Sequence, residues 1–109
     1  MDEAELEKSM EMIVFAGDAE TQALEAIDCI SEGNSIKAKS LFAESRNSLK
    51  KAHAIHKDLL QKIMNGEKVQ PDLILVHAMD HLTAAETYNL IGQKMLNLFG
   101  KYINTKEAK

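Results

Sequence analysis

Apolar residues recur along this chain every three, four or seven positions, which is the period of an α-helix. The first such stripe runs through 4–31 and comprises Leu6, Met10, Ile13, Gly17, Leu24 and Ile27. The second runs through 35–64 and comprises Ala38, Leu41, Phe42, Ser45, Leu49, Ala52, His56, Leu59 and Ile63. Both segments are therefore predicted to be helices, and the scarcity of proline and aromatic residues also favours helix over strand.

Two short polar segments, "SEGNS" and "NGEKVQPD", interrupt this pattern. They hold residues typical of helix ends and helix starts: Gly33, Asn34, Ser35, Gly66, Pro71 and Asp72. The glycines suit helix ends, the asparagine or serine suits the cap of the second helix, and Pro-Asp suits the first turn of a third. Three long helices joined by short turns pack antiparallel. The predicted fold is therefore all-α, an up-down-up three-helix bundle that occupies 1–109 as a single domain.

The third helix, predicted to continue to residue 104, has an unusually wide apolar surface. One line along it comprises Leu73, His77, Asp80, Ala84, Thr87, Ile91, Met95 and Leu98. The adjacent line comprises Ile74, Ala78, His81, Ala85, Tyr88, Gly92, Leu96 and Phe99. The rest of the circumference is left to Glu86, Asn89, Gln93, Lys94 and Asn97. This stripe is too wide for one three-helix core, so we expect the chain to form an oligomer through the third helix.

The composition is that of an ordinary globular chain, with 45% hydrophobic and 28% charged residues. Its net charge of −4 argues against nucleic acid or an anionic membrane as the main partner. The single cysteine, Cys29, cannot form an internal disulfide, and no apolar run approaches the ~20 residues that span a bilayer. Because the acidic N-terminus also lacks an apolar run, we expect no signal peptide, no membrane insertion and a cytoplasmic location.

Two histidines and an aspartate interrupt the apolar segment "LILVHAMDHLT" near the start of the third helix. His77, Asp80 and His81 are three or four residues apart, so they project to neighbouring positions on that helix. A metal site there would need a further ligand, His53 or His56 from the second helix. Phosphoryl transfer would need only an imidazole nitrogen that accepts the group. The spacing leaves both kinds of chemistry open.

The segment "LILVHAMDHLT" resembles the signature L-x-L-V-H-A-Q-D-H-L-M of the lactose/cellobiose (chitobiose) family of enzyme IIA proteins of the sugar phosphotransferase system. The resemblance extends over nearly the whole chain. "IVFAGDAETQALEAI" is similar to the A-G-x-A-R-S-x-A-x-x-A-L segment of that family. "AKSLFAESRNSLKKAHAIHKDLL" is similar to its second-helix segment, which ends in A-H-x-x-Q-T-x-L.

The resemblance implies a homotrimeric phosphocarrier in which His77 is phosphorylated on its tele nitrogen, Nε2. The phosphoryl group would come from the histidine-containing phosphocarrier protein. It would pass to a cysteine of enzyme IIB, which serves the membrane enzyme IIC, for uptake of a β-glucoside, cellobiose, chitobiose or lactose-type disaccharide. His53 and His81 match the other two histidines of the family pattern. Asp80 matches an aspartate that meets its symmetry mates on the three-fold axis, where one Mg²⁺ per trimer would balance their charge.

Three residues depart from the family pattern. Met79 and His56 stand where glutamine is usual, and Glu20 stands where arginine is usual. Since none of the three replaces His77 or Asp80, they affect the expected partner recognition more than the expected chemistry. Two other functions remain open from the residues alone. The first is a non-enzymatic metal-binding helical bundle, and the second is a histidine phosphotransfer domain of a two-component pathway.

Overall fold

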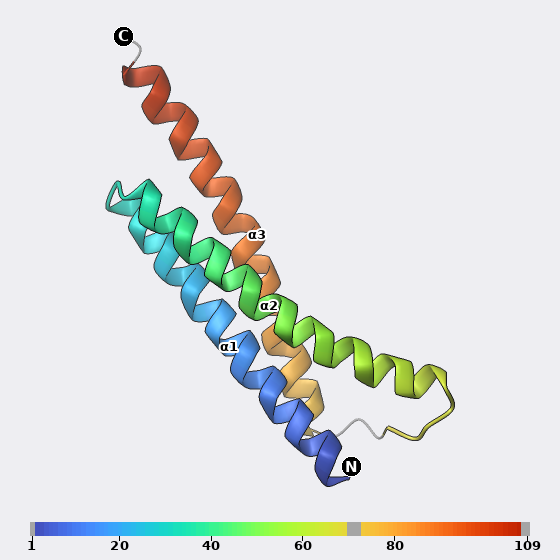
Figure 1. The fold of residues 1–109 in the computed structure, drawn as a ribbon. Coiled ribbons are helices and arrows are strands. Elements are labelled where there is room, and N and C mark those ends of the chain that lie inside the picture. The colour runs from blue at the N-terminus through green and yellow to red at the C-terminus, as the bar shows by residue number, and fades with distance from the viewer. Residues whose placement is uncertain (1, 70–72, 108–109) are drawn as a thin grey trace.

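Three long helices make up the computed structural model, which describes residues 2–69 and 73–107: α1 (Glu3–Ser31), α2 (Ser35–Met64) and α3 (Leu73–Glu107). α1 runs up, α2 runs back down, and α3 runs up again and projects beyond the α1–α2 turn (Figure 1). The molecule is a rod of 62 × 21 × 18 Å. No strand occurs in the described ranges, so the predicted all-α, up-down-up bundle is confirmed. α3 ends three residues later than predicted.

The α1–α2 turn is built by the residues that the sequence singled out. Gly33 has φ +79°, and the Asn34 N–H donates to the Cys29 carbonyl at 2.8 Å, which closes α1 with a left-handed glycine. The Asn34 side chain then accepts a hydrogen bond from the Lys37 N–H at 3.1 Å and caps α2. Gly66 has φ +83° and ends α2 in the same way. The predicted roles of Pro71 and Asp72 lie outside the described residues.

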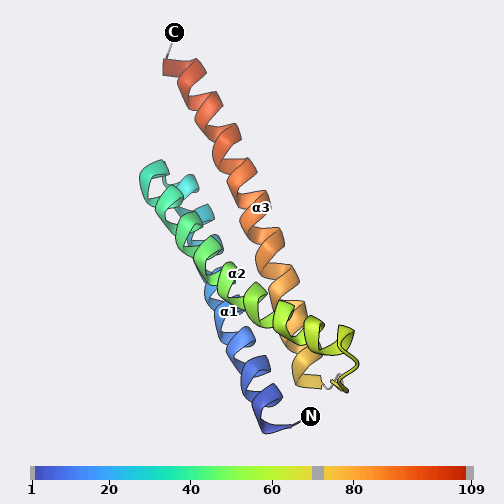
Figure 2. The same cartoon turned by 45° about the vertical axis from the view of Figure 1, so that its right-hand side comes forward.

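The buried face of α1 differs from the predicted apolar stripe. Its core positions are mostly small: Ser9, Met12, Ala16, Ala19, Ala23, Ala26, Cys29 and Ile30. Of the predicted residues, Met10 is 54% and Leu24 is 46% exposed, while the others lie at the edge of the core. The prediction was wrong because it weighted large side chains. α1 lies alongside both α2 and α3 (Figure 2). Its buried alanines allow this close approach, and most of its larger residues flank the contact.

α2 and α3 contribute the rest of the core, including two buried polar residues, Ser45 and Asn89. The predicted α2 stripe is largely confirmed by Phe42, Leu49 and Leu59, although Ile63 is exposed. On α3 the core positions are Leu75, Ala78, Leu82, Ala85, Asn89, Gly92 and Leu96. Asn89, predicted to lie on the polar side, is therefore a correction. Its side-chain amide donates to the Phe42 carbonyl at 3.2 Å, and because that bond satisfies the amide, the residue can be buried.

Much of the apolar surface of α3 has no partner within the chain. Leu73 is 84%, Leu98 68% and Ile91 51% exposed, and all three belong to the first line identified in the sequence. The prediction that α3 carries apolar residues beyond those needed for one bundle is confirmed. Assembly through this surface stays a prediction. Among the described residues, no helix is long and apolar enough to cross a membrane.

Gly92 lets α3 pass close to α2 and α1. A Cβ at this position would lie 2.5 Å from Phe42 Cε1 and 3.1 Å from Ile27 Cγ1. The Phe42 ring is almost completely buried and packs in a cluster with Ala38 and Leu96, so it has little room to move. The glycine is therefore required by the contact rather than by the backbone, which is ordinary helix here.

We expect Gly92→Ala to lower the free energy of unfolding by about 1–3 kcal/mol, because the added methyl group overpacks the contact with Phe42. The cost of overpacking should outweigh the ~1 kcal/mol that alanine gains over glycine in helix propensity. The matched control is Gly17→Ala, whose Cβ would meet nothing within 4 Å and which should stabilise the protein. Urea unfolding followed by circular dichroism at one protein concentration measures both changes. A Gly92→Ala variant as stable as Gly17→Ala would contradict the close approach.

Candidate functional site

The two histidines of the signature lie together on the outer surface of α3. The core residues Ala78 and Leu82 anchor this turn of the helix, which directs His77 outward and His81 to the edge of the core. Their Nε2 atoms are 3.1 Å apart, and their rings meet edge-on, with centroids 4.5 Å apart. This is hydrogen-bond distance, so one of the two nitrogens carries a proton and the other offers a lone pair.

Glu20 of α1 extends this pair across the helix–helix contact. Its Oε1 atom lies 3.5 Å from Nδ1 of His81, and both side chains are partly buried. The three side chains form a continuous path from the Glu20 carboxylate through the His81 ring to His77. Sequence reasoning noted Glu20 only as a departure from the family pattern. Its position next to Ala19 and one turn after Ala16 was the signal, because the α1 alanines mark the face that contacts α3.

His77 forms a wall of two different surface hollows. The first, about 340 Å³, is apolar and is otherwise lined by Ile13, Leu73 and Ile74. The second, about 300 Å³, is lined by His77, Glu20, Asp80, His81 and Ala84. The His77 ring therefore lies between a hollow lined by apolar residues and one whose lining includes two carboxylates and a second histidine. An exposed imidazole thus has apolar side chains on one side and ionisable side chains on the other.

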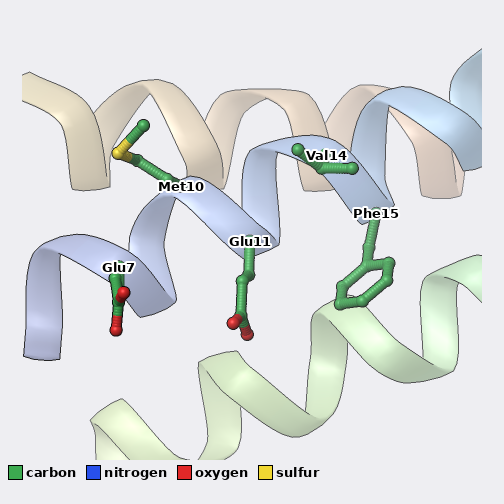
Figure 3. A pocket seen from close by; sticks show the side chains of 5 residues that line it. All are labelled: Glu7, Met10, Glu11, Val14 and Phe15. Atoms are coloured by element: carbon green, nitrogen blue, oxygen red, sulfur yellow. The ribbon is translucent and has the colours of Figure 1, made fainter.

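A further hollow, of about 330 Å³, lies on α1 and has a different character. Figure 3 shows Glu7, Glu11 and Phe15 along the lower edge of one face of that helix, with Met10 and Val14 along the upper edge of the same face. Its lining contains two carboxylates and apolar side chains but no histidine or cysteine. It therefore offers no imidazole or thiol, and the candidate site is the one around His77.

The structure does not bring His53 into this site. His53 lies on α2, where its Nε2 atom is 2.5 Å from Oε1 of Glu86, and both side chains are about half exposed. Its partner is thus an acid on α3 rather than His77 or His81. His56, the other α2 histidine, is half-buried. The structure brings together His77, Asp80 and His81, as predicted, and the catalytic role of His53 stays a prediction.

A metal centre within one chain finds no support in the geometry. Within the described ranges, no three histidine, cysteine, aspartate or glutamate side chains are placed to share an ion. The alternative that combined His77, Asp80 and His81 with a histidine of α2 is therefore not formed in the described part of one chain. Asp80 is exposed, so an ion bound there would take its other ligands from other chains or from water.

Comparison with known proteins identifies the family. Residues 7–100 match the family described as "PTS system, Lactose/Cellobiose specific IIA subunit". The chain belongs to this family. The resemblance stated from its motifs is thus confirmed, and as an enzyme IIA the protein is a component of a phosphotransferase system.

Individual enzyme IIA relatives cover most of the chain. The lichenan-specific phosphotransferase enzyme IIA component of Bacillus subtilis strain 168 is 30% identical over 94% of this chain and 98% of its own length. The cellobiose-specific component of Lactococcus lactis strain IL1403 is 37% identical over 72% of this chain and 68% of its own.

Solved structures share the fold. PtcA from S. mutans has a TM-score of 0.87 at 35% identity, covering 92% of this chain and 99% of that one. The cellobiose-specific enzyme IIA of Bacillus anthracis has a TM-score of 0.89 at 25% identity, covering 95% of each chain. The match over almost the full length of both structures confirms the three-helix architecture in proteins of this family.

Proposed function

We propose that this enzyme IIA is a cytoplasmic phosphocarrier that accepts a phosphoryl group on Nε2 of His77. The donor is the histidine-containing phosphocarrier protein, and the acceptor is a cysteine of enzyme IIB, which serves the membrane enzyme IIC. The observation that carries the proposal is an exposed imidazole whose Nε2 lies 3.1 Å from a second imidazole, in a chain of this family. Relatives named for lichenan, cellobiose and lactose point to a β-glucoside, cellobiose, chitobiose or lactose-type sugar.

The transfer needs little from the protein beyond a free lone pair and a fixed geometry. The lone pair of His77 Nε2 forms the new bond to phosphorus. The N–P bond of the incoming phosphohistidine breaks, and its electron pair stays on the donor imidazole. Nδ1 of His77 keeps its proton, and no proton has to leave Nε2. In the next step a cysteine thiolate attacks phosphorus, and the electron pair of the N–P bond returns to Nε2.

The surroundings of His77 suit a carrier that must also release the group. The polar hollow offers His81 as the nearby hydrogen-bond donor for phosphoryl oxygens. Glu20 and Asp80 line the same hollow, so their carboxylates repel a bound phosphoryl group and favour its release. The apolar hollow on the other side offers a surface against which a partner protein can exclude water.

We further propose that the exposed apolar line of α3 forms a homotrimer. Leu73, Asp80 and Ile91 lie along this line and are exposed in the single chain. If three copies of the line meet on a three-fold axis, three Asp80 carboxylates converge and repel one another. One Mg²⁺ per trimer, held by these carboxylates and by water, would balance that charge. The ion would stabilise the assembly, and no step of the transfer passes through it.

We expect His77→Ala to abolish phosphorylation while leaving the helicity unchanged, since His77 is exposed and supplies the accepting nitrogen. The measurement is the intact mass after incubation with phosphoenolpyruvate, enzyme I and the phosphocarrier protein. His81→Ala should slow the transfer by a factor on the order of 10², the usual cost of losing one donor to a developing charge. His53→Ala should slow it less, because His53 pairs with Glu86 instead. A label that persists in His77→Ala would overturn the assignment.

Light scattering at micromolar concentration should give three times the 12.1 kDa mass of the chain.

A chelator should lower the stability of the wild-type trimer at neutral pH. Asp80→Leu should abolish metal binding yet preserve the trimer, because an apolar axis needs no counter-ion. Asp58→Leu, which removes an exposed acid on α2, is the control and should respond to the chelator as the wild type does. A monomer mass refutes the assembly, and equal chelator responses with no detectable metal refute the axial ion.

A further inference from the structure

We propose that His77 and His81 form a chelating site for a divalent transition-metal ion such as Zn²⁺, and that this ion competes with the phosphoryl group for His77. The Nε2 atoms of both rings ligate the ion, and water completes its coordination shell. The binding follows from the positions of the two rings alone. The competition rests on the phosphocarrier function proposed above.

The distance between the two nitrogens fits a chelate. Nε2 of His77 and Nε2 of His81 are 3.1 Å apart, whereas the ring centroids are 4.5 Å apart, so the Nε2 atoms lie closer together than the ring centres. With Zn–N bonds of about 2.0–2.1 Å, two nitrogens at this separation subtend an angle of about 100° at the ion, close to the tetrahedral value. Histidines four residues apart on one helix recur in zinc sites because they present their nitrogens in this way.

The ion takes the place of the proton that the two rings share. In the hydrogen-bonded pair, one Nε2 atom carries a proton and the other offers a lone pair. In the chelate both rings are neutral, with the proton on Nδ1 and the lone pair of Nε2 directed at the metal. One ring therefore changes its tautomer, and no net proton is gained or lost.

The surroundings of the pair suit a bound cation. Oε1 of Glu20 is 3.5 Å from Nδ1 of His81, the ring nitrogen that does not bind the ion. A carboxylate at this second nitrogen is the usual outer partner of a ligating histidine, because it fixes the orientation of the ring. The hollow of about 300 Å³ that Asp80 and Ala84 also line leaves room for water ligands, and its carboxylates attract positive charge.

This site differs from the two metal sites considered above. The three-ligand centre required a histidine of α2, whereas His77 and His81 both lie on α3 and act with water. The axial ion is held by Asp80 carboxylates of three chains, and such oxygen ligands suit Mg²⁺. Imidazole nitrogens instead suit Zn²⁺, Ni²⁺ and Cu²⁺. Because His77 is exposed and only two side chains ligate the ion, the ion can exchange with solvent.

A bound ion blocks the transfer to His77. Attack on phosphorus uses the lone pair of Nε2, and the metal–nitrogen bond occupies that lone pair. In the phosphorylated protein the N–P bond occupies it instead, so the pair of imidazoles is open to the ion only before phosphorylation. The ion is thus a reversible inhibitor of phosphoryl transfer, and it takes part in no step of it.

Calorimetric titration of the unphosphorylated protein with Zn²⁺ tests the site. His77→Ala and His81→Ala should each weaken the tightest site by at least about tenfold, since even an outer partner of a ligand is worth that much. Excess Mg²⁺ should not displace the ion. The matched control is His53→Ala, which removes an exposed histidine that pairs with Glu86 and should leave that affinity unchanged.

Imidazole ¹⁵N spectra assign the ligands independently of any variant. Zn²⁺ should shift the Nε2 resonances of His77 and His81 together, with the same midpoint as the calorimetric titration. Equal affinity in wild type, His77→Ala and His81→Ala, or spectra in which neither Nε2 resonance moves, would overturn the site.

Phosphorylation rates test the competition. At free Zn²⁺ of about ten times the wild-type Kd, mass action leaves about one tenth of His77 unliganded, so labelling of wild type should slow about tenfold. His81→Ala keeps the nucleophile but loses half of the chelate, so the same Zn²⁺ should lower its own slower rate by no more than about twofold. This variant also controls for effects of Zn²⁺ on the other phosphotransferase proteins.

Equal inhibition of wild type and His81→Ala by Zn²⁺ would overturn the competition. Wild-type protein that accepts no phosphoryl group in zinc-free buffer would refute the phosphocarrier function itself, and the calorimetric and spectroscopic results would still decide the metal site.

Discussion

The close packing of α1 against α3 through small side chains is the constraint on which the rest of this structure depends. Ala16 and Ala19 on one helix lie in one core cluster with Ala78 and Ala85 on the other, and all four are completely buried. Such a contact removes little apolar area per residue, but it permits a short interhelical distance and fixes the rotation of both helices. That rotation places the carboxylate of Glu20 beside His81.

The same constraint explains the apolar surface of the chain. The core side of α3 is already filled by Leu75, Ala78, Leu82, Ala85, Gly92 and Leu96, so its other large residues, such as Leu90, Ile91 and Leu98, lie outside the core. Burying an exposed leucine or isoleucine side chain is worth roughly 1.5–3 kcal/mol, so an exposed line of such residues favours association with another surface. The trimer proposed here would bury that line and would place the Asp80 carboxylates of the three chains near its three-fold axis.

Periodicity predicted three helices, their turns and the two-sided apolar character of α3, because these depend on local pattern and on residues such as Gly33 and Asn34. The face that each helix buries was harder to predict. Most large residues on α1, apart from Met12 and Ile30, flank the core instead of filling it. Asn89 is buried because the Phe42 carbonyl satisfies its amide. Those outcomes depend on contacts between helices, which a single sequence does not display.

The site also combines one contact that local spacing predicts with one that depends on how the helices pack. The pairing of His77 with His81 follows from their spacing on one helix. The contact of Glu20 with His81 joins residues 61 positions apart and required the packed bundle. The most direct test of the account is ³¹P–¹⁵N coupling in the phosphorylated wild-type protein. The account predicts a bond between phosphorus and Nε2 of His77, and a bond to Nδ1 of His77 or to any other histidine would contradict it.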